Sequence, residues 1–380
     1  MKKTISKTFL SGLTAAVFLW GCQKNVETPS TISEEAATTE MAAEQNRPKQ
    51  LKDFVQVNLV GDNNQFNPEH IDASLINAWG IAFPASGPAW VSSMFGGLAK
   101  VFFNDGTGFR VSVFIPSPNA ATGGHPTGVV FNNTTDFKLR NGNPARFIYA
   151  QADGLVSGWN GGETTVKMIE APGELYTGIA LASDGGNNFL YVANFSAGKI
   201  EVFDKTFTEV SKPFKDPYLP PGFSPYNIQN IDGKLYVTYA QNGTKPGEVV
   251  STGRGKGFIS IFNPDGSFVK RFASAGKLNA PWGITKAPEG FWGDDDEDGD
   301  EYKDKDILLV GNFGDGRINA FRSDGKFEGQ LRAHGKAIEI EGLWGLAFPP
   351  SNSTVFDPNH LFFAAGPGGE QHGLFGFIKK

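Results

Sequence analysis

The chain has 380 residues, of which 34 are basic and 40 acidic, and its formal net charge of −6 argues against a nucleic-acid partner or an anionic membrane surface. Hydrophobic residues make up 39% and charged residues 19%, which is typical of a globular protein with a large core. The single cysteine excludes an intrachain disulfide and a zinc site built from cysteines.

The first 21 residues have the pattern of an export signal. Three lysines precede an apolar run at residues 9–20, which is too short for a first-choice membrane span. The run ends in the sequence LWGC at residues 19–22, which resembles a bacterial lipobox. We therefore expect residues 1–21 to be a lipoprotein signal peptide and Cys22 to be the lipidated residue. The alternative is an ordinary cleaved signal with an incidental cysteine.

Residues 22–52 are predicted to be a disordered tether. They are rich in Thr, Ser, Glu, Ala and Gln and poor in large apolar side chains, so they cannot offset the entropy cost of ordering. About 30 flexible residues span roughly 30 Å. The predicted location is the bacterial cell envelope, at an outer membrane and facing the periplasm or the surface. The membrane contact would be the lipid anchor alone.

One short phrase occurs six times in the rest of the chain. It consists of a large or hydroxyl side chain, then Gly or Asn, then an aliphatic residue, and successive copies lie 48 to 62 residues apart. The central residues of the six copies are Gly80, Gly128, Gly178, Asn227, Gly283 and Gly345.

Three further strands are predicted after each phrase except the last, which two strands follow. In the third copy, for example, residues 189–192 form an apolar strand, and residues 198–203 alternate after a glycine turn as in a half-buried strand. Residues 268–272 illustrate the fourth strand, which follows a Pro-Asp-Gly turn. Four antiparallel strands per copy, six times over, predict an all-β fold, a six-bladed β-propeller, over residues 53–380.

The strand count also predicts how the ring closes. The sixth copy ends after its third strand, at residues 374–378, whereas one surplus strand precedes the first copy at residues 54–60. The N-terminal strand should complete the last blade and so remove an exposed sheet edge. We expect a monomer.

Several segments resemble an uncharacterised bacterial family of exported, single-domain propeller proteins, some of which carry PEP-type C-terminal sorting signals. The segments that carry the likeness are FVQVNLV at 54–60, NAWGIAF at 77–83, GNFGDGRINAF at 311–321, GLWGLAF at 342–348, AAGP at 364–367 and HGLFG at 372–376. The resemblance implies the fold and names no activity. The Gly-Arg-Ile-x-x-Phe pattern is also similar to NHL repeats, a binding scaffold that includes some lactonases and lyases.

Candidate ligand contacts surround the predicted mouth of the central channel. Four aromatic side chains precede the repeated central residue, and a ring of aromatics could stack a sugar or another flat ligand, or could simply fill the channel. Neighbouring polar side chains would face the same ligand or a divalent ion. The full candidate set is Asn77, Trp79, His125, Tyr176, Tyr226, Asn227, Asn279, Trp282, Glu341 and Trp344. Residues 341–344 are loosely similar to the start of regucalcin-type lactonases.

An acidic run is the candidate metal site. Asp294, Asp296, Asp298 and Asp300, with a glycine at position 299, match the alternating oxygen ligands that begin a calcium loop. Position twelve of such a loop is Lys305 instead of glutamate, so a solvated acidic loop is the alternative. Calcium is the only cofactor that this pattern suggests.

Histidines and one insertion mark one face of the predicted ring. His70, His125, His334 and His372 are all expected on the channel-mouth face, where a transition metal or ordinary loop roles could account for them. A glycine-rich insertion at residues 241–256 falls on the same face.

No nucleophile elbow, phosphate loop or dinucleotide fingerprint occurs. The sequence therefore favours a binding or scaffolding module for an unknown small molecule, glycan or protein. The alternative is a metal-dependent, lactonase-like hydrolase or lyase with its site at the channel mouth.

Overall fold

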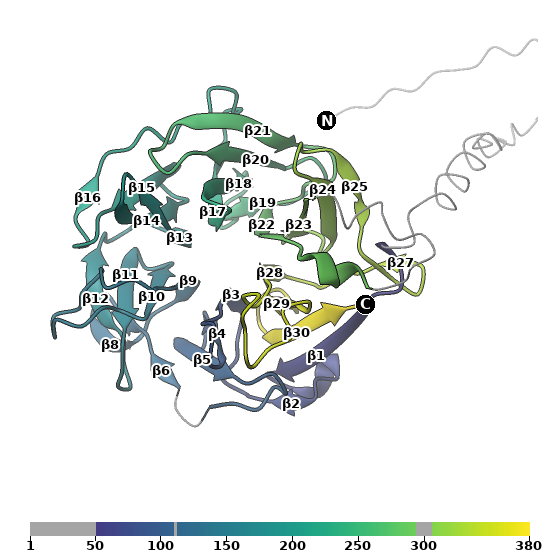
Figure 1. Cartoon of the computed structure of the whole chain (residues 1–380), viewed down its shortest axis with the longest axis horizontal. Coiled ribbons are helices and arrows are strands. Elements are labelled where there is room, and N and C mark those ends of the chain that lie inside the picture. The colour runs from purple at the N-terminus through teal and green to yellow at the C-terminus, as the bar shows by residue number, and fades with distance from the viewer. Residues whose placement is uncertain (1–50, 110–111, 294–305) are drawn as a thin grey trace, which may run out of the picture. The chain divides into compact units, whose positions relative to one another are not determined.

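The computed structural model of the chain describes residues 51–109, 112–293 and 306–380. Strands dominate these residues, and the helical turns among them are two short 3-10 helices, η2 (Asn64–Phe66) and η3 (Glu289–Trp292). Six antiparallel sheets stand like blades around a central axis, as Figure 1 shows. Among these residues no helix is long and apolar enough to span a membrane.

We number the blades by the order of their innermost strands along the chain and give each from the inner to the outer strand. Blades one and two contain β3 (Ala78–Ala82), β4 (Ala89–Ser93), β5 (Leu98–Phe102) and β6 (Val113–Phe114), then β9 (Pro126–Phe131), β10 (Phe147–Gln151), β11 (Leu155–Trp159) and β12 (Val166–Glu170). Blades three and four contain β13 (Tyr176–Asp184), β14 (Asn187–Asn194), β15 (Lys199–Phe203) and β16 (Glu209–Val210), then β17 (Phe223–Ile231), β18 (Lys234–Asn242), β20 (Gly257–Phe262) and β21 (Phe268–Ser274). Blades five and six contain β22 (Pro281–Lys286), β23 (Ile307–Asn312), β24 (Ile318–Arg322) and β25 (Phe327–Gln330), then β28 (Leu343–Ala347), β29 (Leu361–Ala365), β30 (Leu374–Lys379) and β1 (Val55–Gly61). The short strands outside this pattern are β2 (His70–Ile71), β7 (Pro116–Ser117), β8 (Ala120–Gly123), β19 (Val250–Ser251), β26 (Arg332–Ala333) and β27 (Lys336–Ala337).

The predicted fold is confirmed, including the closure of the ring. The N-terminal strand β1 pairs antiparallel with β30, from Val55 opposite Lys379 to Gly61 opposite Leu374. In Figure 1 the purple β1 lies beside the yellow β30, next to the C-terminus. The first and last strands of the propeller therefore share one blade, and each covers an edge that the other would leave open.

The hydrophobic core is divided among the spaces between blades. Each pair of neighbouring blades encloses its own cluster of buried side chains, such as Val91, Phe102 and Phe375 between blades six and one. A further cluster lies on the axis. Because both faces of every blade are covered, each blade is held by two neighbours as well as by its own ladder.

The prediction of half-buried third strands is wrong. β15 and β24 are buried on both faces except at one end, although their sequences alternate between polar and apolar residues. The polar residues are buried with partners: Glu201 accepts hydrogen bonds from Tyr176 and Asn194, and the Oδ1 atom of Asn319 accepts one from Gln330. Packing between blades covers the face that would be wet in an isolated sheet, so alternation here marks buried polar contacts and not solvent exposure.

Candidate functional site

The inner strands approach one another very closely at the repeated phrase. A Cβ atom built on Gly80 would lie 2.7 Å from the carbonyl oxygen of Thr127, and one on Gly345 would lie 2.4 Å from the carbonyl oxygen of Trp79. Glycine is needed at these positions because any side chain would collide with the backbone of the next blade. Asn227 takes this place in blade four, and its side-chain amide donates a hydrogen bond to the carbonyl of Trp282 at 2.9 Å.

Aromatic side chains fill the axis on the side where the inner strands begin. Trp79, Tyr226, Trp282 and Trp344 pack there with Phe195, and the four predicted side chains are between 1% and 5% exposed. We call these five residues the plug. Trp79 and Trp344 stack with their ring centroids 3.5 Å apart, and Trp282 meets both of them edge to face. The structure thus brings together the four aromatics named from the sequence, and it packs them against one another instead of leaving a space between them.

Two of the three indole nitrogens of the plug are satisfied by backbone and amide groups. The indole nitrogen of Trp282 donates to the carbonyl of Thr177 at 3.0 Å, and that of Trp344 donates to the Oδ1 atom of Asn77 at 2.9 Å. The indole nitrogen of Trp79 is buried without a hydrogen-bond partner in the described part of the chain. The plug is therefore a specific arrangement of rings and not only an apolar filling.

One carboxylate at the mouth was missed by the sequence reasoning. Glu370 lies in the loop between β29 and β30, where its Oε2 atom accepts a hydrogen bond from the side-chain nitrogen of Asn77 at 2.8 Å. Burial raises the pKa of the Glu370 carboxyl above its ordinary value, against the opposing effect of that hydrogen bond. Burial, and then the charge of Glu370, raise the pKa of Tyr226. The preceding Gly-Pro-Gly-Gly run was the available signal, because it marks a tight turn that folds the acid back.

The other polar candidates lie around the mouth with separate partners. Asn279 is buried, and its Oδ1 atom accepts the backbone N–H of Gly253 at 2.6 Å. Glu341 is exposed and accepts the backbone N–H of Gly369, one residue before Glu370. Both residues hold the loops that surround the plug.

Tyr176 does not face the channel. Its ring belongs to the cluster between blades two and three, and its hydroxyl donates to the buried Glu201. Burial, followed by the Glu201 carboxylate, raises the pKa of Tyr176. Tyr176 is the first residue of β13, next to Thr177 at the axis, but side chains alternate along a strand, so Tyr176 points between blades and the prediction that it faces the channel mouth is wrong.

The four histidines expected on the mouth face do not converge. The Nδ1 atom of His125 lies 2.8 Å from Asp153, which raises the pKa of the imidazole, whereas that of His372 lies 2.8 Å from Asp62. His334 is exposed in the turn between β26 and β27. Among the residues that the structure describes, no three His, Cys, Asp or Glu side chains are placed to share a metal ion.

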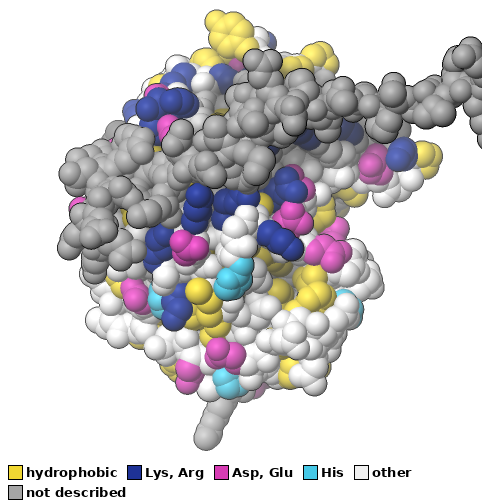
Figure 2. Space-filling view, turned by 90° about the vertical axis from the view of Figure 1, so that its right-hand side faces the viewer, with side chains coloured by type: hydrophobic (Ala, Val, Ile, Leu, Met, Phe, Trp, Pro, Cys, Tyr) yellow, Lys and Arg dark blue, Asp and Glu magenta, His cyan; other side chains and the backbone are white. Residues whose placement is uncertain are grey.

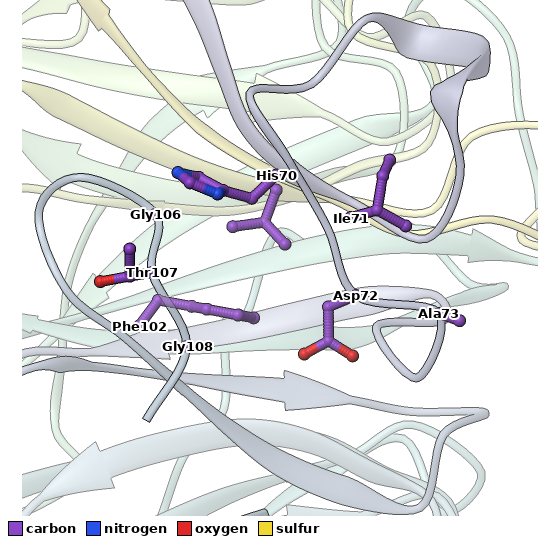
Figure 3. A pocket seen from close by; sticks show the side chains of 9 residues that line it. His70, Ile71, Asp72, Ala73, Phe102, Gly106, Thr107 and Gly108 are labelled. Atoms are coloured by element: carbon purple, nitrogen blue, oxygen red, sulfur yellow. The ribbon is translucent and has the colours of Figure 1, made fainter. Parts of the chain in front are cut away.

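His70 lies in a hollow of its own, which Figure 3 shows. The cavity has a volume of about 460 Å³ and lies between the segment from His70 to Ala73 and the turn at Gly106–Gly108. The Asp72 carboxylate on its wall is already engaged by the buried Lys100 at 2.7 Å. This hollow is a gap beside blade one and not part of the mouth.

The glycine-rich insertion at residues 241–256 folds back onto blade four. Its strand β19 pairs with the end of β18, and Val250 packs against the plug. The Glu248 carboxylate accepts the backbone N–H groups of Thr244 and Lys245 and so closes the tip of the loop. The insertion therefore covers one side of the mouth.

Two predicted features lie outside the described residues. They are the lipidation site Cys22 and the acidic run with Asp294, Asp296, Asp298 and Asp300. Both stay predictions.

The charge on the side of the ring beside the C-terminus is mixed. Figure 2 shows Lys and Arg side chains interspersed with Asp and Glu on the part of that side that grey atoms leave visible. Neither sign forms a continuous field there, and interspersed charges are typical of an ordinary hydrated surface.

These features define a six-bladed β-propeller whose channel is closed at one end by an aromatic plug. The chain belongs to the same protein family as two uncharacterised proteins of Acanthamoeba polyphaga mimivirus. One is 34% identical over 353 residues, which cover 88% of this chain and 82% of the viral protein, and the other is 31% identical over 345 residues, which cover 86% of each. A search against models of known protein families finds no match.

Solved structures with the same fold have little sequence in common with this chain. Virginiamycin B lyase from Staphylococcus aureus superposes with a TM-score of 0.50 at 12% identity, over 86% of this chain and 99% of the lyase. A streptogramin B lyase structure gives the same TM-score at 11% identity, over 86% of this chain and 97% of that chain. At this level the likeness shows a shared propeller fold and no shared chemistry.

Proposed function

We propose that the protein is a binding module of the bacterial cell envelope that meets its partner with the face around the plug. The observation that carries the proposal is the closed channel mouth. Buried, mutually stacked aromatics fill the centre of this face, and a filled centre suits contact with a surface better than enclosure of a substrate.

Exposed groups around the plug support this assignment. Phe95, in the loop between β4 and β5, is 47% exposed and meets the His125 ring edge to face at 6.2 Å. Met94, its neighbour in sequence, packs against the plug. An exposed aromatic beside buried ones, with the polar side chains of His125 and Glu370 near the same mouth, has the composition of an interface core with a polar rim.

The anchor belongs to the same proposal. An exported chain with lipidated Cys22 and a tether over residues 22–52 would hold the propeller near a membrane, which raises the effective concentration of an envelope partner. The Cys22→Ala variant should move the protein from the membrane fraction to the soluble fraction. A variant that stays in the membrane fraction would remove the anchor from the proposal.

Site-specific photocross-linking tests the binding face. A photoreactive phenylalanine analogue is placed at Phe95 in the full chain, and a matched analogue is placed at Tyr218, which is 72% exposed and packs on Phe268 at the outer strand of blade four. We expect a discrete cross-linked product in intact cells from position 95 and none from position 218. Equal products from both positions, or none from position 95, would contradict the proposal.

A second candidate function is a lyase or hydrolase of small molecules, and Glu370 is the observation that favours it. A half-buried carboxyl with a raised pKa is suited to general acid–base chemistry. The lyases that share the fold suggest the first substrate to try, a streptogramin B antibiotic such as virginiamycin B, with and without added divalent cations. Turnover that is lost in Glu370→Gln would establish the enzyme, and unchanged antibiotic in every condition would leave the binding module.

A further inference from the structure

The end of the channel opposite the plug is open. The inner strands diverge there into a cavity of about 350 Å³, which we call the funnel. A smaller void of about 30 Å³ continues from it to the glycine ring at Gly80, Gly128 and Gly345. The smaller void is large enough for a water molecule, and the funnel reaches the size range of small-molecule sites.

The wall of the funnel carries no charged side chain. Its lining comes from the ends of five inner strands and includes two amides among apolar residues: Ile81, Ala82, Phe83, Val129, Val130, Phe131, Ala180, Leu181, Gln229, Asn230, Ala347, Phe348 and Pro350. An ionised ligand would lose hydration there without a compensating charge. The lining therefore selects for an uncharged molecule.

The two sides of the funnel differ in chemistry. Phe83, Phe131 and Phe348 occupy the same strand position on the neighbouring blades one, two and six, and all three line this side of the funnel. Each ring also packs into its own cluster between blades, so the side consists of separate apolar patches. Blade four places Gln229 and Asn230 on the lining, and the Asn230 amide already donates to the carbonyl of Leu181 at 2.9 Å. The Gln229 side chain is exposed and makes no hydrogen bond within the described part of the chain, so its amide is available to a ligand.

The backbone adds further hydrogen-bonding groups. Each inner strand pairs with one neighbour only, so its other edge faces the axis. Peptide N–H and C=O groups on that edge are not used by the ladder of the blade. Some are bonded by side chains, as the Leu181 carbonyl is by Asn230, and the others are open to water or to a ligand.

We propose that the funnel binds an uncharged small molecule that combines an apolar ring face with hydrogen-bonding groups. The ring would lie against the apolar side that Phe83, Phe131 and Phe348 line, and the polar groups would meet Gln229 and the strand-edge groups that no side chain occupies. This site is separate from the binding face around the plug, because the plug and the glycine ring lie between them.

Two fluorescent probes of similar size and different charge test the proposal on the full chain. Prodan is a neutral aromatic ketone, whereas 8-anilinonaphthalene-1-sulfonate carries a sulfonate. We expect prodan to bind saturably, with one site per chain and a blue-shifted emission, and the sulfonate to bind at least tenfold more weakly. Non-saturable prodan binding, or equal affinity for the two probes, would overturn the proposal.

Substitutions in the funnel test whether prodan binds there. Ala347→Phe fills the funnel from within and should weaken prodan binding at least tenfold, and Gln229→Leu should weaken it several-fold. Gln229→Trp narrows the entrance from an exposed position that tolerates bulk, so it tests the site even if Ala347→Phe does not fold. Phe95→Ala, on the plug face, is the matched control and should leave binding unchanged. Loss of binding in the control, or unchanged binding in Gln229→Trp, would place the probe elsewhere and overturn the proposal.

Discussion

At the scale of single residues, Asn77 connects two groups at the channel mouth. The oxygen of its side-chain amide accepts a hydrogen bond from the indole of Trp344, while the nitrogen of the same amide donates one to the carboxylate of Glu370. Asn77 itself has a φ of +52°, a left-handed conformation that asparagine tolerates better than most residues. One amide thereby links the plug to a carboxyl that burial disfavours in its charged form.

The raised pKa of Glu370 predicts that the stability of the fold depends on pH. A carboxyl whose pKa is higher in the folded than in the unfolded state binds its proton more tightly when folded, so folding is favoured below the ordinary value of 4.5 and loses stability as pH rises through the folded pKa. Glu370→Gln should therefore raise the melting temperature at pH 8, by on the order of 1–2 °C for this partly solvated group, and change it little at pH 4. Thermal unfolding at both pH values is the measurement.

The matched control for that prediction is Glu69→Gln, since Glu69 is exposed and its carboxylate has no hydrogen bond among the described residues. It should leave the melting temperature unchanged at both pH values. A Glu370→Gln variant that is less stable at pH 8 would show that the carboxylate stabilises the mouth instead of straining it.

At the scale of elements, the inner strands of five blades approach the next blade at a distance that requires glycine. At Gly345 the backbone of blade six meets the carbonyl of Trp79 in blade one, and the same contact recurs around the ring. Where Asn227 takes the place of glycine, its side-chain amide donates a hydrogen bond to the carbonyl of Trp282 in the next blade. The repeated phrase thus encodes the spacing between blades and not only the beginning of a strand.

This spacing predicts the effect of one added methyl group. In Gly345→Ala the new Cβ atom would lie 2.4 Å from the Trp79 carbonyl oxygen, and the strands must move apart. We expect a loss of about 1–3 kcal/mol in the free energy of unfolding, measured by urea denaturation. Gly108→Ala is the control, because its nearest neighbour, Phe102, lies 3.9 Å away. Equal stability of the two variants would show that the contact at Gly345 relaxes without cost.

At the scale of the whole molecule, stability depends on closing the ring. Phe54, Leu59 and Val60, in or beside β1, are each 2% exposed or less, and they join the clusters on the two sides of blade six. Blade six would otherwise end at β30 with an unpaired edge. The cooperative unit is therefore the complete ring of blades.

A pair of truncations tests this closure. A chain that begins at residue 62 lacks β1 and should aggregate or unfold well below the melting temperature of a chain that begins at residue 51, which keeps β1 and its buried neighbours. Light scattering after size-exclusion chromatography and thermal unfolding are the measurements. A monomeric and equally stable shorter chain would contradict the role of β1.

Much of the fold was predictable because repetition fixes it. The six phrases, the strand count and the surplus N-terminal strand determined the number of blades and the closure, since a strand without a partner must find one. The four aromatics of the plug were also predictable as neighbours, because equivalent positions in a closed ring come together at the axis.

The tertiary structure alone decided the rest. Glu370 comes 293 residues after Asn77, and no local pattern relates a loop carboxylate to an amide of another blade. The packing of blades face to face also decides where Tyr176 points, why Glu201 and Asn319 are buried, and why the histidines have separate partners. This packing depends on contacts between residues that are far apart in the sequence. The sequence by itself determined how many blades there are and how they close, whereas the packed ring decided which end of its channel is filled and which is open.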